Sequence, residues 1–333
     1  MSFVIRPFNK DSDGDYAMLA AIRYEITPEH AVTVEEMKDG EKRRDPRCKR
    51  GRWIAETAET GEGIGFGSYG QSSWAYDPQR FNLNIGVRPG NVGYGVGKAL
   101  YDTVMAELSL LHPTELHSNV REDWERGLQF ASDRGFEEEM REWESRLDVP
   151  AFDGSLWNEA RQRPLRGGIE IHSYADLARD AKRDRKLHAL VTQTFCDVPS
   201  TVPLTPPPFE RYREQVLESP NFLPSGLMIA IESATGNYVG SSEVSKRQIC
   251  DDLDTGLTGV LRDYRGRGIA LALKLRIIDF AKSLGTPVIT TANATTNQAM
   301  LSINEALGFV KQPAWISLAR RTPENQKTRI TEA

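Results

Sequence analysis

The sequence has few of the residues that mark metal sites and disulfide frameworks. It contains 3 cysteines and 5 histidines in 333 residues, and none of them forms a CxxC or HxxxH pair. Cys48, Cys196 and Cys250 are widely separated and odd in number, which indicates reduced thiols in a cytoplasmic protein. We therefore expect no disulfide framework and no metal site.

Long apolar runs and an excess of basic residues are also missing. No apolar stretch approaches the roughly 18 residues that span a bilayer, and Arg6 brings a charge too early for a signal peptide. The formal net charge is -5, from 42 Lys and Arg against 47 Asp and Glu. Such a chain has no general attraction to nucleic acid or anionic membranes, so we expect neither as a partner. A monomer and a homodimer are both compatible with this composition.

The chain repeats itself. Its length suits two domains, and 39% hydrophobic with 27% charged residues is typical of globular proteins. Val87 and Val260, within two glycine-rich segments, are 173 residues apart, and Gly135 and Gly308, each followed by Phe, have the same separation. A shared offset over about 50 residues indicates an internal duplication.

Both halves predict the same order of elements. Each opens with a short strand and a helix (13–26 and 175–195), followed by a polar or Pro-rich loop (Glu41–Arg52 and Asp197–Phe209). Two strands follow (52–57 and 63–70; 227–233 and 238–245), then a third strand, the glycine-rich turn, a long amphipathic helix and a final strand–helix–strand. This alternation predicts two α/β layered domains, at 1–150 and 168–322, joined by a linker at 151–167 that is rich in Pro, Gly and Arg.

A strand that enters a glycine-rich turn and then a helix is a device for binding phosphate, because the first N–H groups of the helix are unpaired and point outward. The second half has Arg265-Gly266-Arg267-Gly268-Ile269-Ala270, and the first has Gly93-Tyr94-Gly95-Val96-Gly97 without an arginine. Neither turn fits the Walker A or the GxGxxG pattern. A tight connection is the alternative interpretation.

At this point the residues resemble a family. Val260–Leu273, V-x-x-x-x-R-G-x-G-x-A-x-x-L, resembles the acyl-CoA-binding motif of the GNAT superfamily of N-acetyltransferases, and Asn297–Phe309 is similar to its second motif. Tandem members such as mycothiol synthases are more weakly similar. The resemblance implies two tandem GNAT-type domains, each a mixed, mostly antiparallel sheet flanked by helices, with the better-preserved site in the second half.

The resemblance also implies acetyl-CoA as co-substrate and assigns residues to it. The pyrophosphate would lie on the backbone amides of Arg265, Gly266, Arg267, Gly268, Ile269 and Ala270. Gly259 and Val260 would lie beside the pantetheine arm, and Asn293 and Asn297 would hydrogen-bond to it. A loop cap is the alternative for both asparagines. The matching first-half positions are Val87, Gly93, Tyr94, Gly95, Val96 and Gly97.

Several residues differ from the family pattern, and these differences concern catalysis. Many members have a tyrosine that protonates the leaving thiolate, where this sequence has Asn304 and, in the first half, Ala131. A thiolate with a pKa of about 8.5 leaves without strong acid assistance, and Asn304 remains a candidate for bonding the sulfur or a water. Val92 and Trp124 replace the first half's Arg and Asn, which favours a weakened or structural role for that half.

The remaining candidates concern the acceptor. An attacking amine needs a base, and Glu243 and Asp254 are the carboxylates near the loop strand, with a solvated surface position as the alternative for each. The segment Asp197–Phe209 is expected to form a stiff wall of the acceptor pocket, with Phe195 beside it. The segment 41–52 has five arginines and is either a solvated loop or an anchor for an anionic substrate or for the CoA 3′-phosphate.

Three functions follow from these features. The first is an acetyl-CoA-dependent N-acyltransferase that moves an acetyl group to a primary amine of a small molecule by direct attack. The second is a non-catalytic acyl-CoA-binding or sensing protein, suggested by the missing tyrosine. In the third, the duplication only mimics a dimer interface within one chain.

Overall fold

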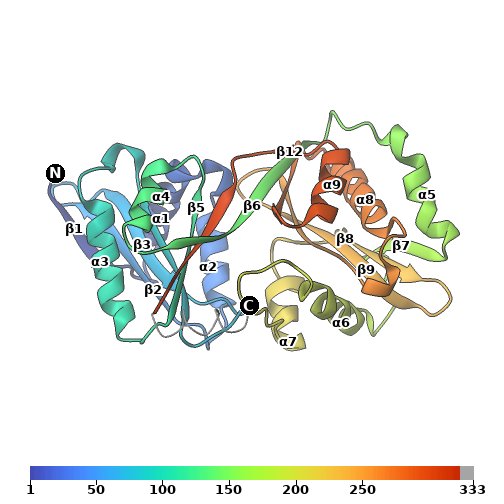
Figure 1. Ribbon diagram of the computed structural model, residues 1–333, viewed down its shortest axis with the longest axis horizontal. Helices are drawn as coiled ribbons and strands as arrows, with labels where there is room; N and C mark the ends of the chain where they lie inside the picture. The colour runs from blue at the N-terminus through green and yellow to red at the C-terminus, as the bar shows by residue number, and fades with distance from the viewer. Residues whose placement is uncertain (323–333) are drawn as a thin grey trace. The chain divides into compact units, whose positions relative to one another are not determined.

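The computed structural model describes residues 1–322, which form two compact units (Figure 1). Unit 1 comprises residues 1–139 together with the segment that begins at Ile316, and unit 2 comprises Met140–Trp315. Within each unit, helices lie on both faces of the paired strands (Figure 1). No helix in the described part of the chain is long and apolar enough to span a membrane.

The sheet of unit 1 has the strand order β1-β2-β3-β4-β5-β13. The pairs β1–β2, β2–β3 and β3–β4 are antiparallel, whereas β4 and β5 pair in parallel. The strands are β1 (Phe3–Pro7), β2 (Arg50–Thr57), β3 (Gly63–Gly70), β4 (Arg80–Val87), β5 (Glu115–Arg121) and β13 (Trp315–Arg321). The helices are α1 (Asp13–Ile26), η1 (Pro28–His30), α2 (Val34–Lys42), η2 (Pro89–Asn91), α3 (Val96–Ser109) and α4 (Glu125–Ser132).

Two layers of helices enclose this sheet. A side chain at Gly67 would meet Val104 of α3, whereas one at Gly86 would meet Ile26 of α1, so α3 and α1 lie on opposite faces. The predicted helix at 13–26 is confirmed, and it begins at a Ser12 side chain that accepts from the Asp15 amide. The sequence interpretation missed α2, which begins with a capping box of Thr33 and Glu36.

Unit 2 repeats this architecture with the strand order β7-β8-β9-β10-β11-β6, and β12 pairs with β6. Its strands are β6 (Glu137–Asp148), β7 (Ile169–Ser173), β8 (Phe222–Glu232), β9 (Asn237–Lys246), β10 (Leu253–Val260), β11 (Val288–Ala294) and β12 (Val310–Lys311). Its helices are η3 (Gly154–Trp157), α5 (Asn158–Arg166), α6 (Arg183–Phe195), α7 (Phe209–Tyr212), η4 (Arg213–Leu217), η5 (Arg262–Tyr264), α8 (Ile269–Leu284) and α9 (Gln298–Ala306). The long helix α8 ends at Gly285, whose φ of 72° closes it.

The two halves of the chain exchange their last strands. Strand β6 follows α4 of the first half, yet its residues 142–148 pair with β11 in unit 2. Strand β13 is the last strand of the second half, yet it lies beside β5 in unit 1, where Ser317 donates to Asn119 at 2.9 Å. Each sheet therefore contains one strand from the other half of the sequence.

This exchange corrects the expected division of the chain at 1–150 and 168–322. A strand pairs with whichever edge satisfies its N–H and C=O groups, and nothing local in the sequence specifies that edge. The expected linker at 151–167 also differs from the structure, because most of it folds into η3 and α5, and α5 packs against α8. In addition, Arg50 and Arg52 belong to strand β2 rather than to the loop expected at 41–52.

The exchange predicts that a mutation in β13, at the end of the second half, destabilises unit 1, and that a mutation in β6, at the end of the first half, destabilises unit 2. Ile316 of β13 is 2% exposed in the unit 1 core, so Ile316→Ala should cost about 2–5 kcal/mol of stability. Hydrogen exchange monitored by mass spectrometry should then show faster exchange in β4 and β5.

Leu147→Ala in β6 is the matched control. Leu147 is 3% exposed in the core of unit 2, so its truncation should accelerate exchange in β10 and β11 instead. An Ile316→Ala protein that loses protection only in unit 2 would contradict the assignment of β13.

Candidate functional site

The glycine-rich turn of unit 2 presents a row of free backbone donors. Gly266 has a φ of 74° and Gly268 a φ of 81°, a left-handed conformation that bends the chain from η5 into α8. Among the described residues, the N–H groups of 266–271 have no hydrogen-bond acceptor, and the first paired amide is that of Ala272, bonded to the Gly268 carbonyl. Free N–H donors at a helix N-terminus are the arrangement that suits an anion.

The strand that leads to this turn separates from its neighbour. Strands β10 and β11 pair only at Leu253 with Ile289 and at Asp254 with Thr290, although β10 continues to Val260. Beyond Asp254, the edge of β10 that faces β11 is not paired with it, and the register with β9 shifts between Thr255 and Thr258. A bulged strand with an open edge can bond an extended ligand.

Glu243 of β9 lies over this irregular part of β10. A Cβ atom at Gly256 would stand 2.5 Å from the Glu243 Oε1, and the carboxylate accepts a hydrogen bond from the Leu257 amide. Glu243 is surrounded by protein yet keeps part of its surface exposed, and burial raises its pKa above the usual value of 4.5. It is a carboxylate enclosed by protein, with an increased affinity for a proton.

Asp254, the second expected base, has a different environment. Its side chain is 49% exposed, and the Arg247 guanidinium stands 3.8 Å away. A half-exposed carboxylate beside a cation is in contact with solvent, whereas Glu243 is enclosed by protein. The structure therefore favours Glu243 over Asp254 as a proton acceptor.

The three candidate asparagines near the second motif all have hydrogen-bond partners within the protein. Asn297 caps α9, where its Oδ1 accepts from the Met300 amide at 3.3 Å, as in the cap alternative. Asn304 is 2% exposed, and its Nδ2 donates to the Asn293 Oδ1 at 2.6 Å. The Asn304 Oδ1 is buried and has no donor among the described residues.

Helices α6 and α7 form a wall beside β9 and β10. Thr194 of α6 contacts Gly259, where a Cβ atom would stand 2.5 Å from the threonine Cβ. The His188 ring pairs with the Pro207 carbonyl at 2.9 Å and contacts the rings of Phe209 and Tyr212. Burial raises the pKa of Tyr212 far above its usual range, and Glu243 adds to this effect. Tyr212 is therefore a neutral phenol near Glu243, which the sequence did not identify.

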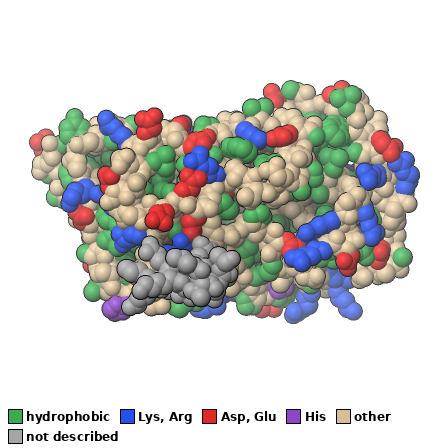
Figure 2. Space-filling model, viewed as in Figure 1, with side chains coloured by type: hydrophobic (Ala, Val, Ile, Leu, Met, Phe, Trp, Pro, Cys, Tyr) green, Lys and Arg blue, Asp and Glu red, His purple; other side chains and the backbone are tan. Residues whose placement is uncertain are grey.

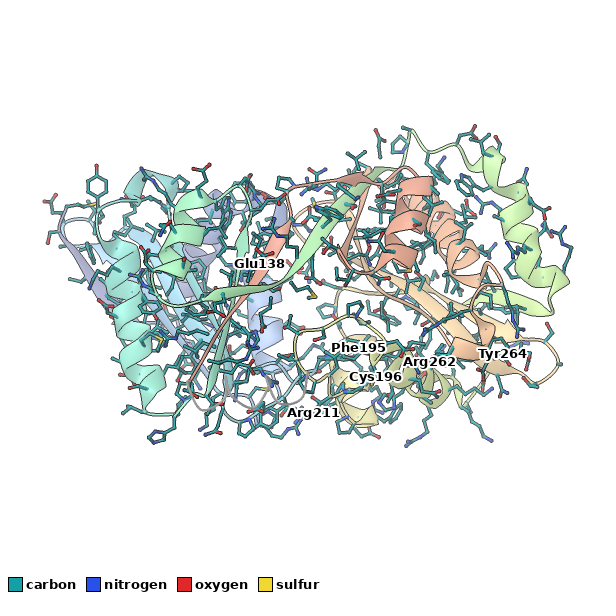
Figure 3. All side chains as sticks on the ribbon, in the orientation of Figure 1. Glu138, Phe195, Cys196, Arg211, Arg262 and Tyr264 are labelled. Carbon is teal, nitrogen blue, oxygen red and sulfur yellow. The ribbon has the colours of Figure 1, made fainter. Side chains whose placement is uncertain are left out.

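The expected arginines of the turn are largely engaged by the protein itself. Arg265 donates to the Val260 carbonyl at 2.9 Å and pairs with Asp197. Asp197 also pairs with Arg262, which Figure 3 shows near Phe195 and Cys196. These contacts lower the pKa of Asp197 to about 2. Arg267 bonds the Asp263 carbonyl and lies over the Tyr264 ring, 4.8 Å from its centroid.

A third arginine reaches the turn from a segment that the sequence predicted to be a linker. Arg163 of α5 donates to the Gly266 carbonyl at 3.3 Å, and its Cδ stands 3.2 Å from the position of a Cβ atom at Gly268. Lys and Arg side chains gather over the region of unit 2 that carries α5 (Figure 2). The signal missed in the sequence is the run of arginines 161, 163 and 166 in one short helix.

Similarity to known proteins is found by comparing structures and not by comparing sequences. No protein-family model matches the sequence, and a search of curated proteins gives no significant match. A GCN5-related N-acetyltransferase from Sphaerobacter thermophilus is 17% identical, with a TM-score of 0.70 over 96% of this chain and 95% of that one. A tandem GNAT protein from the clavulanic acid biosynthesis pathway is 18% identical, with a TM-score of 0.70 over 96% and 98% of the two chains.

The chain has the tandem GNAT fold. Coverage of almost the full length of both proteins means that the duplicated architecture, rather than one domain, is shared. The glucosamine N-acetyltransferase region of a fungal multi-domain GH3 β-N-acetylglucosaminidase also matches, with 14% identity and a TM-score of 0.72 over 96% of this chain and 38% of that one.

The first copy of the GNAT turn keeps the backbone but changes the side chains. Gly93 and Gly95 have φ of 95° and 85°, and α3 begins at Val96, which is 1% exposed. Tyr94 is 60% exposed where Arg267 stands in unit 2. The strands β4 and β5 also pair at only three positions, so the opening of the sheet is repeated.

Pairing registers relate the two copies residue by residue. Val87 pairs with Gly65 in unit 1, and the matching Val260 pairs with Gly240 in unit 2, so Gly65 and Gly240 are equivalent. Three residues further along each strand, Ser68 of β3 is therefore equivalent to Glu243 of β9. Unit 1 therefore lacks a carboxylate at the position where unit 2 has one.

The contact of Arg163 with the turn predicts a role in anion binding. Arg163→Gln should weaken the binding of CoA by about threefold to tenfold, as expected for one partly exposed charged hydrogen bond, and should reduce its salt dependence. Calorimetric titration at two salt concentrations measures both effects. Arg166→Gln, which alters an exposed arginine of the same helix that pairs with Glu159, should leave the affinity unchanged.

Proposed function

We propose that this protein is an N-acyltransferase that uses unit 2 to move an acetyl group from acetyl-CoA to a primary amine of a small molecule. The observation that carries the proposal is the combination, in one unit, of free amides at 266–271, an open β10 edge and the carboxylate of Glu243. Diphosphate, an extended amide-containing arm and a protonated amine are the groups that these three features suit.

The turn would hold the coenzyme diphosphate. The N–H groups of Gly266 to Ala270 would donate to its oxygens, the dipole of α8 would favour the negative charge, and Arg163 and Arg267 would add positive charge beside it. The free edge of β10 near Gly259 and Val260 would bond the amides of the pantetheine arm. Asn293 would contribute less than expected, because its Oδ1 already accepts from Asn304.

The reaction would be direct attack of the amine nitrogen on the thioester carbonyl carbon. The C–N bond forms, the C–S bond breaks, and the thiolate leaves while the nitrogen loses a proton. Binding both reactants at contact distance accounts for most of the acceleration. A free N–H of β10 would stabilise the charge that develops on the carbonyl oxygen.

Glu243 would receive the amine proton. Its increased pKa suits this role, because a base whose pKa approaches the working pH accepts a proton more readily than an ordinary carboxylate does. The neutral Tyr212 beside it would help to shape the acceptor pocket together with the α6–α7 wall. Thiolate protonation would fall to solvent, since Asn304 replaces the tyrosine of many GNAT proteins.

An acyl-CoA-binding protein without turnover is the second candidate. The observation that favours it is Asn304, which is buried, bonded to Asn293 and unable to act as an acid. Thiol release from acetyl-CoA across a panel of amines separates the two functions. Turnover with any amine supports catalysis, whereas tight CoA binding without turnover supports sensing.

Blocking the turn tests where the coenzyme binds. Gly268→Val would place a β-branched side chain at φ 81° against Arg163 and over the free amides, and we expect CoA affinity to fall at least about tenfold. Gly95→Val is the matched control, because that residue has a φ of 85° and open space around it in unit 1. Calorimetry should show one binding site that Gly95→Val preserves; equal loss in both variants would contradict the choice of unit 2.

Replacing the carboxylate tests the base. Glu243→Gln should lower kcat by about a hundredfold or more and flatten the rise of kcat/KM with pH, because the wild-type base becomes active as pH rises through its elevated pKa. Asp254→Asn should retain the wild-type profile, since Asp254 is half exposed beside Arg247.

Glu243→Gln should lower activity but raise the stability of the folded protein at neutral pH. The folded protein binds the Glu243 proton more tightly than the unfolded chain does, so the free energy of unfolding falls as pH rises from the unfolded to the folded pKa. Glu243→Gln removes this loss and should raise Tm at neutral pH. A variant that is both less active and less stable would indicate a structural role for Glu243 instead.

A further inference from the structure

A cavity of ≈ 370 Å³ lies within unit 1, between α1 and α2 on one side and β2 and β3 on the other. Three arginines, Arg23, Arg50 and Arg52, line it together with apolar side chains that include Phe8 and Phe66. A space of this size, with apolar walls and a few convergent polar groups, is typical of small-molecule sites.

The strand register explains why arginines reach this cavity. Trp53 and Ala55 of β2 belong to the core beneath α3, so the alternating Arg50 and Arg52 face α1 and α2. Arg52 is opposite Ser68 in the pairing of β2 with β3, and its side chain is 10% exposed. Arg50 is the most exposed of the three arginines, with 39% of its side chain accessible.

Positive charge in the cavity exceeds the negative charge that could balance it. Glu41 pairs with Arg44, Arg50 and Arg52 and so is shared by three cations. Glu36, which also lines the cavity, uses its Oε2 to accept from the Thr33 amide.

Arg23 has no ion pair or side-chain hydrogen bond among residues 1–322. Burial, together with the charge of Arg52, lowers its pKa. A guanidinium held in this way is stabilised by a bound anion.

The cavity of unit 1 lies where unit 2 has its candidate catalytic residue, Glu243. Ser68 occupies the place of Glu243, and Arg52, its cross-strand neighbour, occupies the place of Leu227, which pairs with Glu243. Where unit 2 has an acid beside an apolar residue, unit 1 has a hydroxyl beside a buried arginine. This position in unit 1 suits a negatively charged ligand rather than an amine.

We propose that unit 1 binds a small organic anion, in which a carboxylate or phosphate is attached to an aromatic or aliphatic group. The charged group would contact Arg23 and Arg52, whose planar guanidinium groups fit carboxylate and phosphate oxygens. The apolar group would contact Phe8, Leu19 and Phe66. This site lies within unit 1 and does not depend on the function proposed for unit 2.

Calorimetric titration of the full chain with four probes tests the proposal. Phenylacetate and phenyl phosphate supply the two charged groups, 2-phenylethanol lacks the charge, and inorganic phosphate lacks the apolar group. We expect one or both aromatic anions to bind at least about tenfold more tightly than 2-phenylethanol and inorganic phosphate. Comparing the two aromatic anions shows whether carboxylate or phosphate is preferred.

Substitutions locate the site. Arg23→Gln and Arg52→Gln should each weaken binding of the preferred anion by roughly tenfold, whereas Lys49→Gln, an exposed cation next to β2, should not. Arg23→Gln should also keep or raise Tm, because it removes a half-buried unpaired charge, so weaker binding would not reflect unfolding.

Three results would overturn the proposal: no binding of either aromatic anion, equal binding by the Arg23→Gln and Lys49→Gln proteins, or loss of binding in saturating CoA. The last result would identify the coenzyme itself as the anion. Because Glu243→Gln lies in unit 2 and should bind the anion as the wild type does, failure of the proposed transferase activity and failure of this proposal remain distinguishable.

Discussion

The availability of backbone amides at the start of α8 is the constraint on which the functional interpretation depends. The N–H groups of 266–271 remain free because Gly266 and Gly268 adopt positive φ and turn the chain directly into the helix. A side chain at Gly268 would crowd Arg163 and, at this positive φ, would strain the backbone. The open edge of β10 continues this row of donors, so a ligand that carries both phosphate and amides can bond to one continuous stretch of chain.

Reciprocal exchange of β6 and β13 explains why both copies of the fold are retained. Without the strand that the other half contributes, the edge of β5 or β11 would be unpaired in this arrangement, and an exposed edge of this kind promotes aggregation. Unit 1 therefore has a structural role whatever its turn binds. That role relaxes the demand on its site residues, so Val92 and Ser68 differ from Arg265 and Glu243 while Gly93 and Gly95 keep their backbone conformation.

Local patterns in the sequence predicted the repeated elements, the glycine turns and helix 13–26, because each depends on residues that are neighbours in the chain. The exchange of β6 and β13 could not be predicted, since pairing partners are chosen by edges that form only in the folded molecule. The same holds for Arg163, which reaches Gly266 across about 100 residues of sequence. Glu243 was one of two candidates, and it is separated from Asp254 by its enclosed position over Gly256 and by the exposure of Asp254 beside Arg247, which the sequence does not show.

At neighbouring rather than equivalent positions, the two units bear charges of opposite sign, and both charges are poorly compensated. Glu243 has one amide donor and a raised pKa, whereas Arg52 shares Glu41 with two other arginines and stands near the unpaired Arg23. A buried charge without a dedicated partner lowers stability, and substitution by an apolar residue would remove that cost. Retention of such charges on neighbouring positions of the two copies is explained if each acts on a ligand: a base for an ammonium group in unit 2 and a cationic site for an anion in unit 1. On this argument, duplication has separated two binding specificities on one backbone rather than leaving one working copy and one inactive copy.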